Sequence, residues 1–209
     1  MTSAQVVAMA TSQVGYHEKV TNTPVDDLYP FRNAYDGQDN WTKYLNDLGE
    51  AQGQPWCGFF AYWVFWQLLD KNFSNTNNFL HGISGKGGAT SSWKLAFETV
   101  GQYHEGDGYT PKVGDVVLYW DPPGVPWSHV EIIVDVTYWP NSIMTVGGNT
   151  KNPEEAGLED ESMWVAKRTR YPGWTSGWRI RGYCETDLDN MPTMGSMLFI
   201  RRRFGTVFG

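Results

Sequence analysis

Hydrophobic and polar positions divide this chain into a helical first half and a strand-rich second half. Segments with helical spacing of apolar residues, or with helix caps at their ends, are residues 3–14, 40–48, 57–70 and 91–101. The third segment differs from the others because its apolar residues surround the whole helix axis. Such a helix is expected to be buried, and at this length it is too short to cross a bilayer.

The second half alternates β-rich runs with turn residues. Strands are predicted at residues 112–120, 129–136, 142–148, 163–170 and 178–183. Helices followed by a meander of strands indicate an α+β domain, in which N-terminal helices pack on an antiparallel β-sheet. Two segments, 20–38 and 72–91, are expected to be loops, because they are rich in Asn, Gly, Pro and Ser.

Length and composition favour one globular domain. The 209 residues are 41% hydrophobic and 19% charged, which separates the chain from disordered proteins. The net charge of −7 argues against nucleic acid as a partner, since proteins that bind phosphate backbones usually carry a basic face. No apolar run has the length of a membrane span, so no membrane insertion is expected.

The two ends of the chain add expectations about processing and organisation. The opening "MTSAQVVAMATSQVG" lacks the charged and apolar regions of a signal peptide, so we expect synthesis in the cytoplasm without one. The expected catalytic domain covers residues 1–185, and residues 186–209 form a tail of unassigned role. Two cysteines, Cys57 and Cys184, do not make the disulfide framework of a small secreted protein.

Cys57 opens the buried helix, in "GQPWCGFFAYWVFWQLLD". One interpretation is a small apolar residue that fills space, as most buried cysteines do. The alternative is a nucleophile, because the macrodipole and free N–H groups at a helix N-terminus lower the pKa of a thiol.

A thiolate nucleophile needs a general base and a group that orients that base. Of the four histidines, His129 alone opens a predicted strand, "HVEIIVDV". Val130, Ile132, Val134 and Val136 alternate onto one face of that strand, which places His129 on the other face with Glu131 and Asp135. Asn149, in "TVGGNT" after the next strand, is the candidate orienting residue; the alternative is a Gly-Gly-Asn turn.

In this order, "PWCGFFAYWV", "YTPKVGDVVLYW", "SHVEIIVDV" and "TVGGNT" resemble the CHAP family, the cysteine, histidine-dependent amidohydrolases/peptidases of the papain-like NlpC-type superfamily. The resemblance covers roughly residues 3 to 185. It implies a papain-like fold with Cys57 as nucleophile and His129 as base. Many relatives carry Glu-x-Asn at the third position. Here Gly147 takes the place of the glutamate, so the resemblance leaves the orienting role with Asn149.

The resemblance implies acyl transfer through a thioester, and it requires no metal. The Cys57 N–H is the natural first oxyanion donor, and the candidates for the second are Gln52, Gln54 and Tyr44. Some relatives bind calcium through an Asp-rich loop before the nucleophile. The sequence "DLGEAQGQPW" lacks that pattern, and "YDGQDN" at 35–40 is a weak substitute, so calcium is an alternative that the sequence does not predict.

The substrate implied by the resemblance is bacterial peptidoglycan, cut at the N-acetylmuramoyl-L-alanine amide or within the stem peptide or cross-bridge. Tryptophans near the site or in loops are the candidate sugar-binding residues: Trp56, Trp120, Trp127, Trp174 and Trp178. The alternative interpretation makes each of them part of the core or its rim.

A phage endolysin, which leaves the host through a holin pore, or a virion-associated lysin fits this description. Targeting would then come from the tail, a fusion partner or the virion. Two alternatives stay open. One is an intracellular amidase on a small γ-glutamyl or polyamine-peptide conjugate. The other is a non-catalytic phage tail component that binds the wall.

Overall fold

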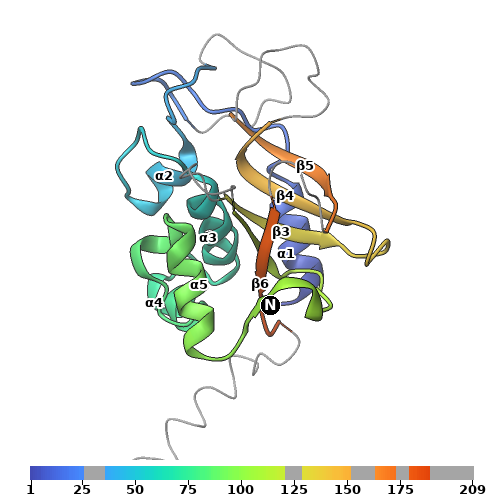
Figure 1. The fold of residues 1–209 in the computed structure, drawn as a ribbon. Coiled ribbons are helices and arrows are strands. Elements are labelled where there is room, and N and C mark those ends of the chain that lie inside the picture. Colours follow the sequence, from blue (N-terminus) through green and yellow to red (C-terminus); the bar gives the residue numbers. More distant parts are fainter. Residues whose placement is uncertain (26–35, 121–128, 152–162, 173–178, 189–209) are drawn as a thin grey trace, which may run out of the picture.

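The structure is a computed structural model, and it describes residues 1–25, 36–120, 129–151, 163–172 and 179–188, without the side chains of Asp107 and Trp120. It is an α+β fold in which helices pack on an antiparallel sheet (Figure 1). The helices are α1 (Ser3–Thr11), α2 (Lys43–Leu48), α3 (Cys57–Leu68), α4 (Phe73–Phe79) and α5 (Thr90–Thr99), with two 3₁₀ turns, η1 (Ser84–Gly87) and η2 (Gly106–Gly108). The predicted fold class is confirmed.

Local sequence sets the ends of the first two helices. Thr2 and Gln5 form a reciprocal capping box at the start of α1. Thr42 caps α2, and Gly49 ends it in the left-handed conformation that glycine adopts without steric cost. Both helices therefore begin and end close to where the sequence predicts.

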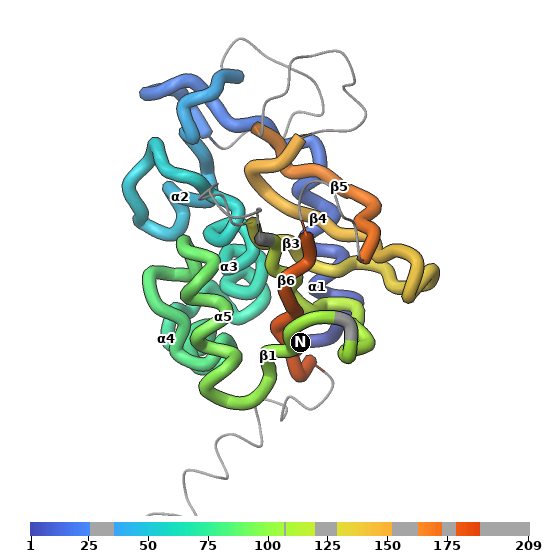
Figure 2. The backbone as a smooth tube through the Cα atoms, in the orientation of Figure 1, coloured from blue at the N-terminus to red at the C-terminus, as the bar shows by residue number. Residues whose placement is uncertain are grey.

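Helix α3 is the centre of the helical layer. Its residues from Cys57 to Trp66 are all buried, as the all-round apolar pattern predicts. It contacts α1, α2 and α4 on its helical sides and strands β3 and β4 on the sheet side (Figure 2). Among the described residues, no helix is long and apolar enough to cross a membrane.

The prediction of a loop over 72–91 is wrong in part, because α4 and η1 lie there. The Asn72 side chain caps α4 by accepting from the Asn75 N–H. Tertiary contacts then stabilise the short helix: the Tyr62 hydroxyl donates to Asn77 Oδ1 at 2.8 Å, and Phe79 packs on Phe65. Packing from α3 compensates for the weak helix propensity of an Asn-rich segment.

Within the described part of the chain, the sheet has six strands in the order β1-β6-β2-β3-β4-β5, with every neighbouring pair antiparallel. Their bounds are Tyr103–Glu105, Val116–Trp120, His129–Asp135, Ile143–Thr150, Trp164–Arg170 and Arg179–Cys184 for β1 to β6. Strands β2 to β5 form the predicted meander, and β6 returns to pair with β2. The three-residue β1 was not predicted, because it is too short to show a period.

The two faces of the sheet have different neighbours. Val130, Ile132 and Val134 of β3 face the main core shared with α3, as the alternation predicts. Ile133 belongs to a smaller cluster on the opposite face. The prediction for Val136 is wrong: a register shift between Ile133 and Asp135 ends the alternation, and Val136 packs against the smaller cluster.

Gly147 and Gly148 lie within β4, not in a turn. A β-carbon at Gly148 would meet the Trp56 ring and lie 2.7 Å from Phe60 Cβ, so the absence of a side chain lets β4 approach α3. The register of β4 against β5 shifts between Gly147 and Thr150, and Asn149 has a φ of 53° within this bulge. The alternative interpretation as a turn between strands is therefore wrong.

Residues 186–188 pack on the domain. The Thr186 hydroxyl donates to the Gly114 carbonyl at 2.9 Å, and Leu188 is 4% exposed. A β-carbon at Gly114 would collide with Leu188 Cδ1 and lie 3.8 Å from Ser3 Cα. The chain thus returns to the start of α1 before residue 189, where the described part ends.

Gly58 sets how closely α3 approaches the η1 segment. A β-carbon at this position would overlap the Gly87 carbonyl oxygen and lie 3.3 Å from that of Gly88. We predict that Gly58→Ala destabilises the protein by about 2 kcal/mol or more, because a buried overlap with backbone cannot relax cheaply. The measurement is the free energy of unfolding in urea.

The matched control is Gly108→Ala. Gly108 is exposed, its φ lies outside the left-handed region, and no atom lies within 4 Å of an added β-carbon. We expect a change within about 0.5 kcal/mol there. Equal effects of the two substitutions would contradict the close approach of α3 to η1.

Candidate active site

Cys57 is the first residue of α3, and Trp56 is its N-cap. The first N–H groups of a helix have no acceptor within the helix, so they form a site of positive potential. The Gly58 N–H donates to the Cys57 sulfur, as does the Val130 N–H from strand β3. The sulfur therefore lies where the helix start meets the sheet, and 6% of Cys57 is exposed.

His129 is the first residue of β3, and its side chain hydrogen-bonds the Cys57 side chain. The ring contacts Glu131 Oε1 through Nε2 at 3.1 Å. The Tyr119 ring lies 5.9 Å from the imidazole, centroid to centroid. The structure thus brings together Cys57 and His129, the first two predicted site residues, from positions 72 residues apart in the chain.

The charges of the pair stabilise each other. Burial disfavours the thiolate, but the charge of His129 and the hydrogen bonds from His129, Val130 and Gly58 outweigh it, so the pKa of the Cys57 thiol is lowered. Burial also disfavours the imidazolium, yet Cys57 and Glu131 together raise the pKa of His129 to about 9. The thiolate of Cys57 and the imidazolium of His129 therefore stabilise each other at this site.

Glu131 is a site residue that the sequence analysis did not assign. Its carboxylate is fully buried and contacts side chains from three strands. Oε1 contacts His129, and Oε2 accepts from Thr145 Oγ1 at 2.6 Å and from Arg170 Nε at 2.9 Å. A second nitrogen of Arg170 donates to Oε1, so the guanidinium binds both carboxylate oxygens.

This arrangement explains the charge state of Glu131. Burial raises the pKa of a carboxyl, but the positive charges of Arg170 and His129 hold the pKa of Glu131 well below its usual range. The signal in the sequence was the His-x-Glu spacing, which places both side chains on one face of β3. Asn149, the predicted orienting residue, lies at the bulge near the end of β4 and is partly exposed; its role stays a prediction.

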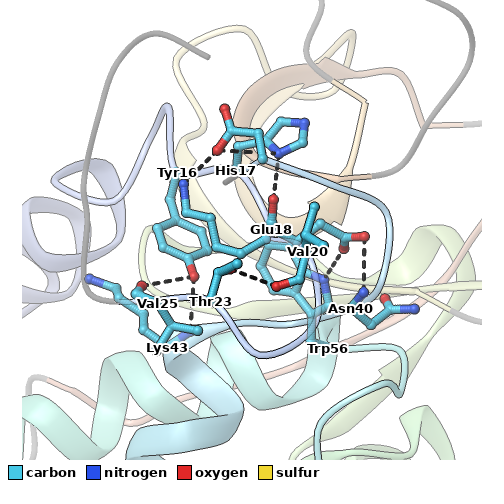
Figure 3. Close-up of polar contacts among 11 residues, drawn as sticks. Tyr16, His17, Glu18, Val20, Thr23, Val25, Asn40, Lys43 and Trp56 are labelled. Atoms are coloured by element: carbon cyan, nitrogen blue, oxygen red, sulfur yellow. Dashed lines mark hydrogen bonds and ion pairs between the residues drawn. The ribbon is translucent and has the colours of Figure 1, made fainter. Parts of the chain in front are cut away.

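Trp56 anchors the start of α3 (Figure 3). Its indole N–H donates to Glu18 Oε2 at 2.7 Å, while Glu18 Oε1 accepts from the Asn40 N–H at 3.1 Å. The ring stacks on Tyr44 with centroids 5.4 Å apart and is fully buried. The proposal of Trp56 as a sugar-binding residue is therefore wrong, since it presents no face to a substrate. It fixes the residue that precedes Cys57.

The three side-chain candidates for the second oxyanion donor are engaged elsewhere. The Gln52 amide exchanges two hydrogen bonds of 2.8 Å with the Thr42 backbone. Gln54 Nε2 donates to the Ala51 carbonyl at 2.7 Å. Tyr44 is fully buried, and its hydroxyl donates to Gln13 Oε1 at 3.3 Å. The structure gives none of them a donor directed at Cys57, and the N-terminal N–H groups of α3 remain the candidate donors.

The other candidate tryptophans cannot be placed at the site. Trp120 ends β2, but its side chain is outside the described part. Trp127, Trp174 and Trp178 lie outside the described residues.

The aspartates of "YDGQDN" bind protein groups. Asp36 pairs with the buried Lys19 ammonium at 2.6 Å, and Asp39 accepts from the Thr21 N–H and hydroxyl at 2.8 and 2.9 Å. Within the described ranges, no group of three or more His, Cys, Asp or Glu side chains could hold a metal ion.

Cys57 and Cys184 are both free thiols. Cys184 is fully buried on β6, where burial raises its pKa well above the ordinary value. The two cysteines thus have opposite environments: one ionises readily beside a histidine, and the other stays protonated in the core. A polarised thiolate beside a histidine can attack a carbonyl carbon and then supply a proton to the leaving group.

Comparison with known proteins agrees with this geometry. Residues 49–149 match the family described as CHAP domain, and the match includes Cys57, His129, Glu131 and Asn149. No curated protein and no solved structure matches the chain.

The different environments of the two cysteines generate a prediction. At pH 7, iodoacetamide should alkylate Cys57 at least tenfold faster than Cys184, because one thiol carries a lowered pKa and the other is buried and protonated. Peptide mapping by mass spectrometry of the folded protein measures both rates. His129→Ala should slow alkylation of Cys57 and leave Cys184 unchanged; equal rates at the two cysteines would contradict the assignment.

Proposed function

Residues 49–149 match the CHAP domain family, and on that premise we propose that the chain is a peptidoglycan hydrolase with Cys57 as nucleophile and His129 as general base. CHAP domains act on peptidoglycan, and they are cysteine-dependent amidohydrolases. The observation that carries the proposal is the hydrogen-bonded pair of Cys57 at the start of α3 and His129 at the start of β3, in which the histidine lowers the pKa of the thiol.

The reaction is amide hydrolysis in two steps. The Cys57 thiolate attacks the amide carbonyl carbon, and the His129 imidazolium gives its proton to the leaving amine as the C–N bond breaks. Neutral His129 then takes a proton from water, whose oxygen attacks the thioester and releases the carboxylic acid and the thiolate. N–H groups at the start of α3 stabilise the negative oxygen in both steps.

Within this chemistry we propose the amide between N-acetylmuramic acid and L-alanine, or a peptide bond of the stem or cross-bridge, as the bond cut. The leading biological role is a phage endolysin or virion-associated lysin that meets the wall from inside or from the particle. The net charge of −7 does not favour approach to anionic wall polymers, so we expect targeting by a partner, a fused module or a virion.

The small-substrate alternative expects a basic residue that anchors a carboxylate. Arg170, the arginine that reaches the site, has its guanidinium bound to Glu131 on both oxygens, which favours the wall substrate. The non-catalytic alternative expects no activated thiol. The free Cys57 beside His129 supports an enzyme instead.

The proposed reaction depends on the Cys57 thiol. Wild-type protein should release fragments from purified peptidoglycan, and Cys57→Ala should reduce the rate by at least a thousandfold, because no other group forms the thioester. Mass spectrometry of the fragments identifies the new termini and hence the bond. Cys184→Ala is the control and should retain activity. Release by Cys57→Ala at the wild-type rate would overturn the assignment of the nucleophile.

If the wild type releases nothing from several wall chemotypes, the wall substrate is excluded. Release of an amine from γ-glutamyl or polyamine-peptide conjugates would then support the small-substrate alternative.

The proposed reaction should also depend on pH. Activity needs Cys57 as thiolate and His129 as imidazolium. The value of kcat/KM should rise as Cys57 loses its proton, below the usual range for a thiol, and fall again near pH 9 as His129 loses its own. A rate profile from pH 4 to 11 on a soluble muropeptide measures both limbs. A falling limb near pH 6.5, the ordinary value for histidine, would contradict a stabilised imidazolium.

A further inference from the structure

The carboxylate of Glu131 is the best-connected buried charge beside the candidate nucleophile and base. It lies two residues after His129 on the same strand, with no exposed surface. His129, Thr145 and Arg170 all contact its two oxygens, from β3, β4 and β5 respectively. A carboxylate so fixed has no freedom to rotate, and neither has the ring that it holds.

The neighbouring strand leaves space for this side chain at one position. A β-carbon at Gly147 would lie 2.5 Å from Glu131 Cγ and 3.0 Å from its Oε1. The φ of Gly147 lies outside the left-handed region, so the backbone conformation does not require glycine, and the three atoms nearest to an added β-carbon all belong to the Glu131 side chain. A side chain from 147 and one from 131 would therefore compete for the same volume.

We propose that Glu131 is the positioning residue for His129, held by Arg170 and Thr145 in the space that Gly147 leaves open. The proposal rests on the proposed function and deepens it. The orienting carboxylate of Glu131 lies on β3, the same strand as His129, and β4 leaves space for it at Gly147. Asn149 is then not required to orient the imidazole.

The charges along this line alternate. The Cys57 thiolate is followed by the His129 imidazolium, the Glu131 carboxylate and the Arg170 guanidinium, so each charge has an opposite neighbour. Two negative and two positive groups compensate one another in a buried site where an unpaired charge would be costly. Arg170 also lies over the Tyr119 ring, with its Cζ 5.0 Å from the centroid.

The described groups that face His129 come from each element packed against it. They are Cys57 of α3, Tyr119 of β2 and Glu131 of β3, with Arg170 of β5 bound to the carboxylate and Arg168 of β5 interacting with it electrostatically. Replacing Glu131 by Gln keeps a side chain of the same shape and removes its charge. The imidazolium of His129 then loses a negative neighbour while Arg170 keeps its positive charge, so the imidazolium becomes less stable. Because the imidazolium stabilises the thiolate, the thiolate of Cys57 becomes less stable as well.

The first test reads the thiol and needs no substrate. The alkylation rate of Cys57 by iodoacetamide, measured against pH by mass spectrometry, gives the titration of the thiolate. Glu131→Gln should move its midpoint upward by about one pH unit, which lowers the rate about tenfold at pH values well below the midpoint. Asp135→Asn is the matched control, because it removes a partly exposed carboxylate from the same strand, and it should leave the midpoint unchanged.

The second test moves the carboxylate between strands. Glu131→Ala should shift the midpoint as Glu131→Gln does. Adding Gly147→Glu to Glu131→Ala should restore it, because the new side chain enters the vacated volume from β4 and meets the same arginine. Gly147→Glu alone should instead destabilise the protein, as two side chains would then compete for one space. Thermal unfolding of each variant separates loss of fold from loss of positioning.

The outcomes separate the two proposals. An unchanged midpoint in folded Glu131→Gln overturns the positioning role, and a shift in Asn149→Ala without one in Glu131→Gln transfers that role to Asn149. If Glu131→Gln does not fold, Glu131→Asp retains the charge and retracts it: a smaller upward shift supports the proposal, and an unchanged midpoint overturns it. If Glu131→Gln shifts the midpoint but the wild type cleaves no wall preparation, the positioning role of Glu131 is supported and only the proposed substrate is refuted.

Activity gives an independent readout. On a soluble muropeptide, Glu131→Gln should lower kcat at least tenfold with little change in KM, since Glu131 contacts the base and not the substrate. A change confined to KM would overturn the positioning role.

Discussion

The cost of holding the Glu131 carboxylate away from water governs the arrangement of this site. A buried charge without a partner costs several kcal/mol, and it is tolerated when opposite charges and hydrogen bonds surround it. Here Arg170 provides two nitrogens, Thr145 a hydroxyl and His129 a ring nitrogen. Three strands must therefore keep their register for the histidine to stay in place, which makes the sheet itself part of the candidate active site.

The helical layer holds the candidate nucleophile in place, as the sheet holds the histidine. Trp56, immediately before the candidate nucleophile, is fixed by Glu18 and stacked on Tyr44. Gly148 lets β4 approach that tryptophan closely. The thiol is therefore positioned by the core, while the imidazole is positioned by the sheet, and neither depends on a surface loop. Such rigid support is what a short-lived proton transfer between two side chains needs.

Much of this fold could be predicted because its signals are local. Helix α3 is apolar on every side, and β3 alternates between two faces, so burial and orientation followed from periods of 3.6 and 2. Helix α4 could not be predicted in the same way, since its Asn-rich segment is stabilised by Tyr62 and Phe65 from α3. Contacts between segments that are distant in the chain leave no periodic pattern of apolar and polar residues in the sequence.

The residues of the candidate site also differ in whether local sequence signals predict them. Cys57 and His129 follow from a helix start and a strand start, both visible in the sequence. The family's usual glutamate position falls on the following strand, where Gly147 stands, whereas the spacing of His129 and Glu131 places both on one face of β3. The burial of Trp56 could not be predicted, because the abundance of an aromatic residue does not reveal how deeply each copy is buried.

The packing of Leu188 beside Gly114 and Ser3 has a topological consequence. Both ends of the described chain arrive at one place on the domain, so a short linker between them would close the chain into a ring. The order of strands and helices along the chain could then change while their arrangement in space stayed the same. A ring opened at another surface turn would present the same thiol, imidazole and carboxylate from a permuted sequence.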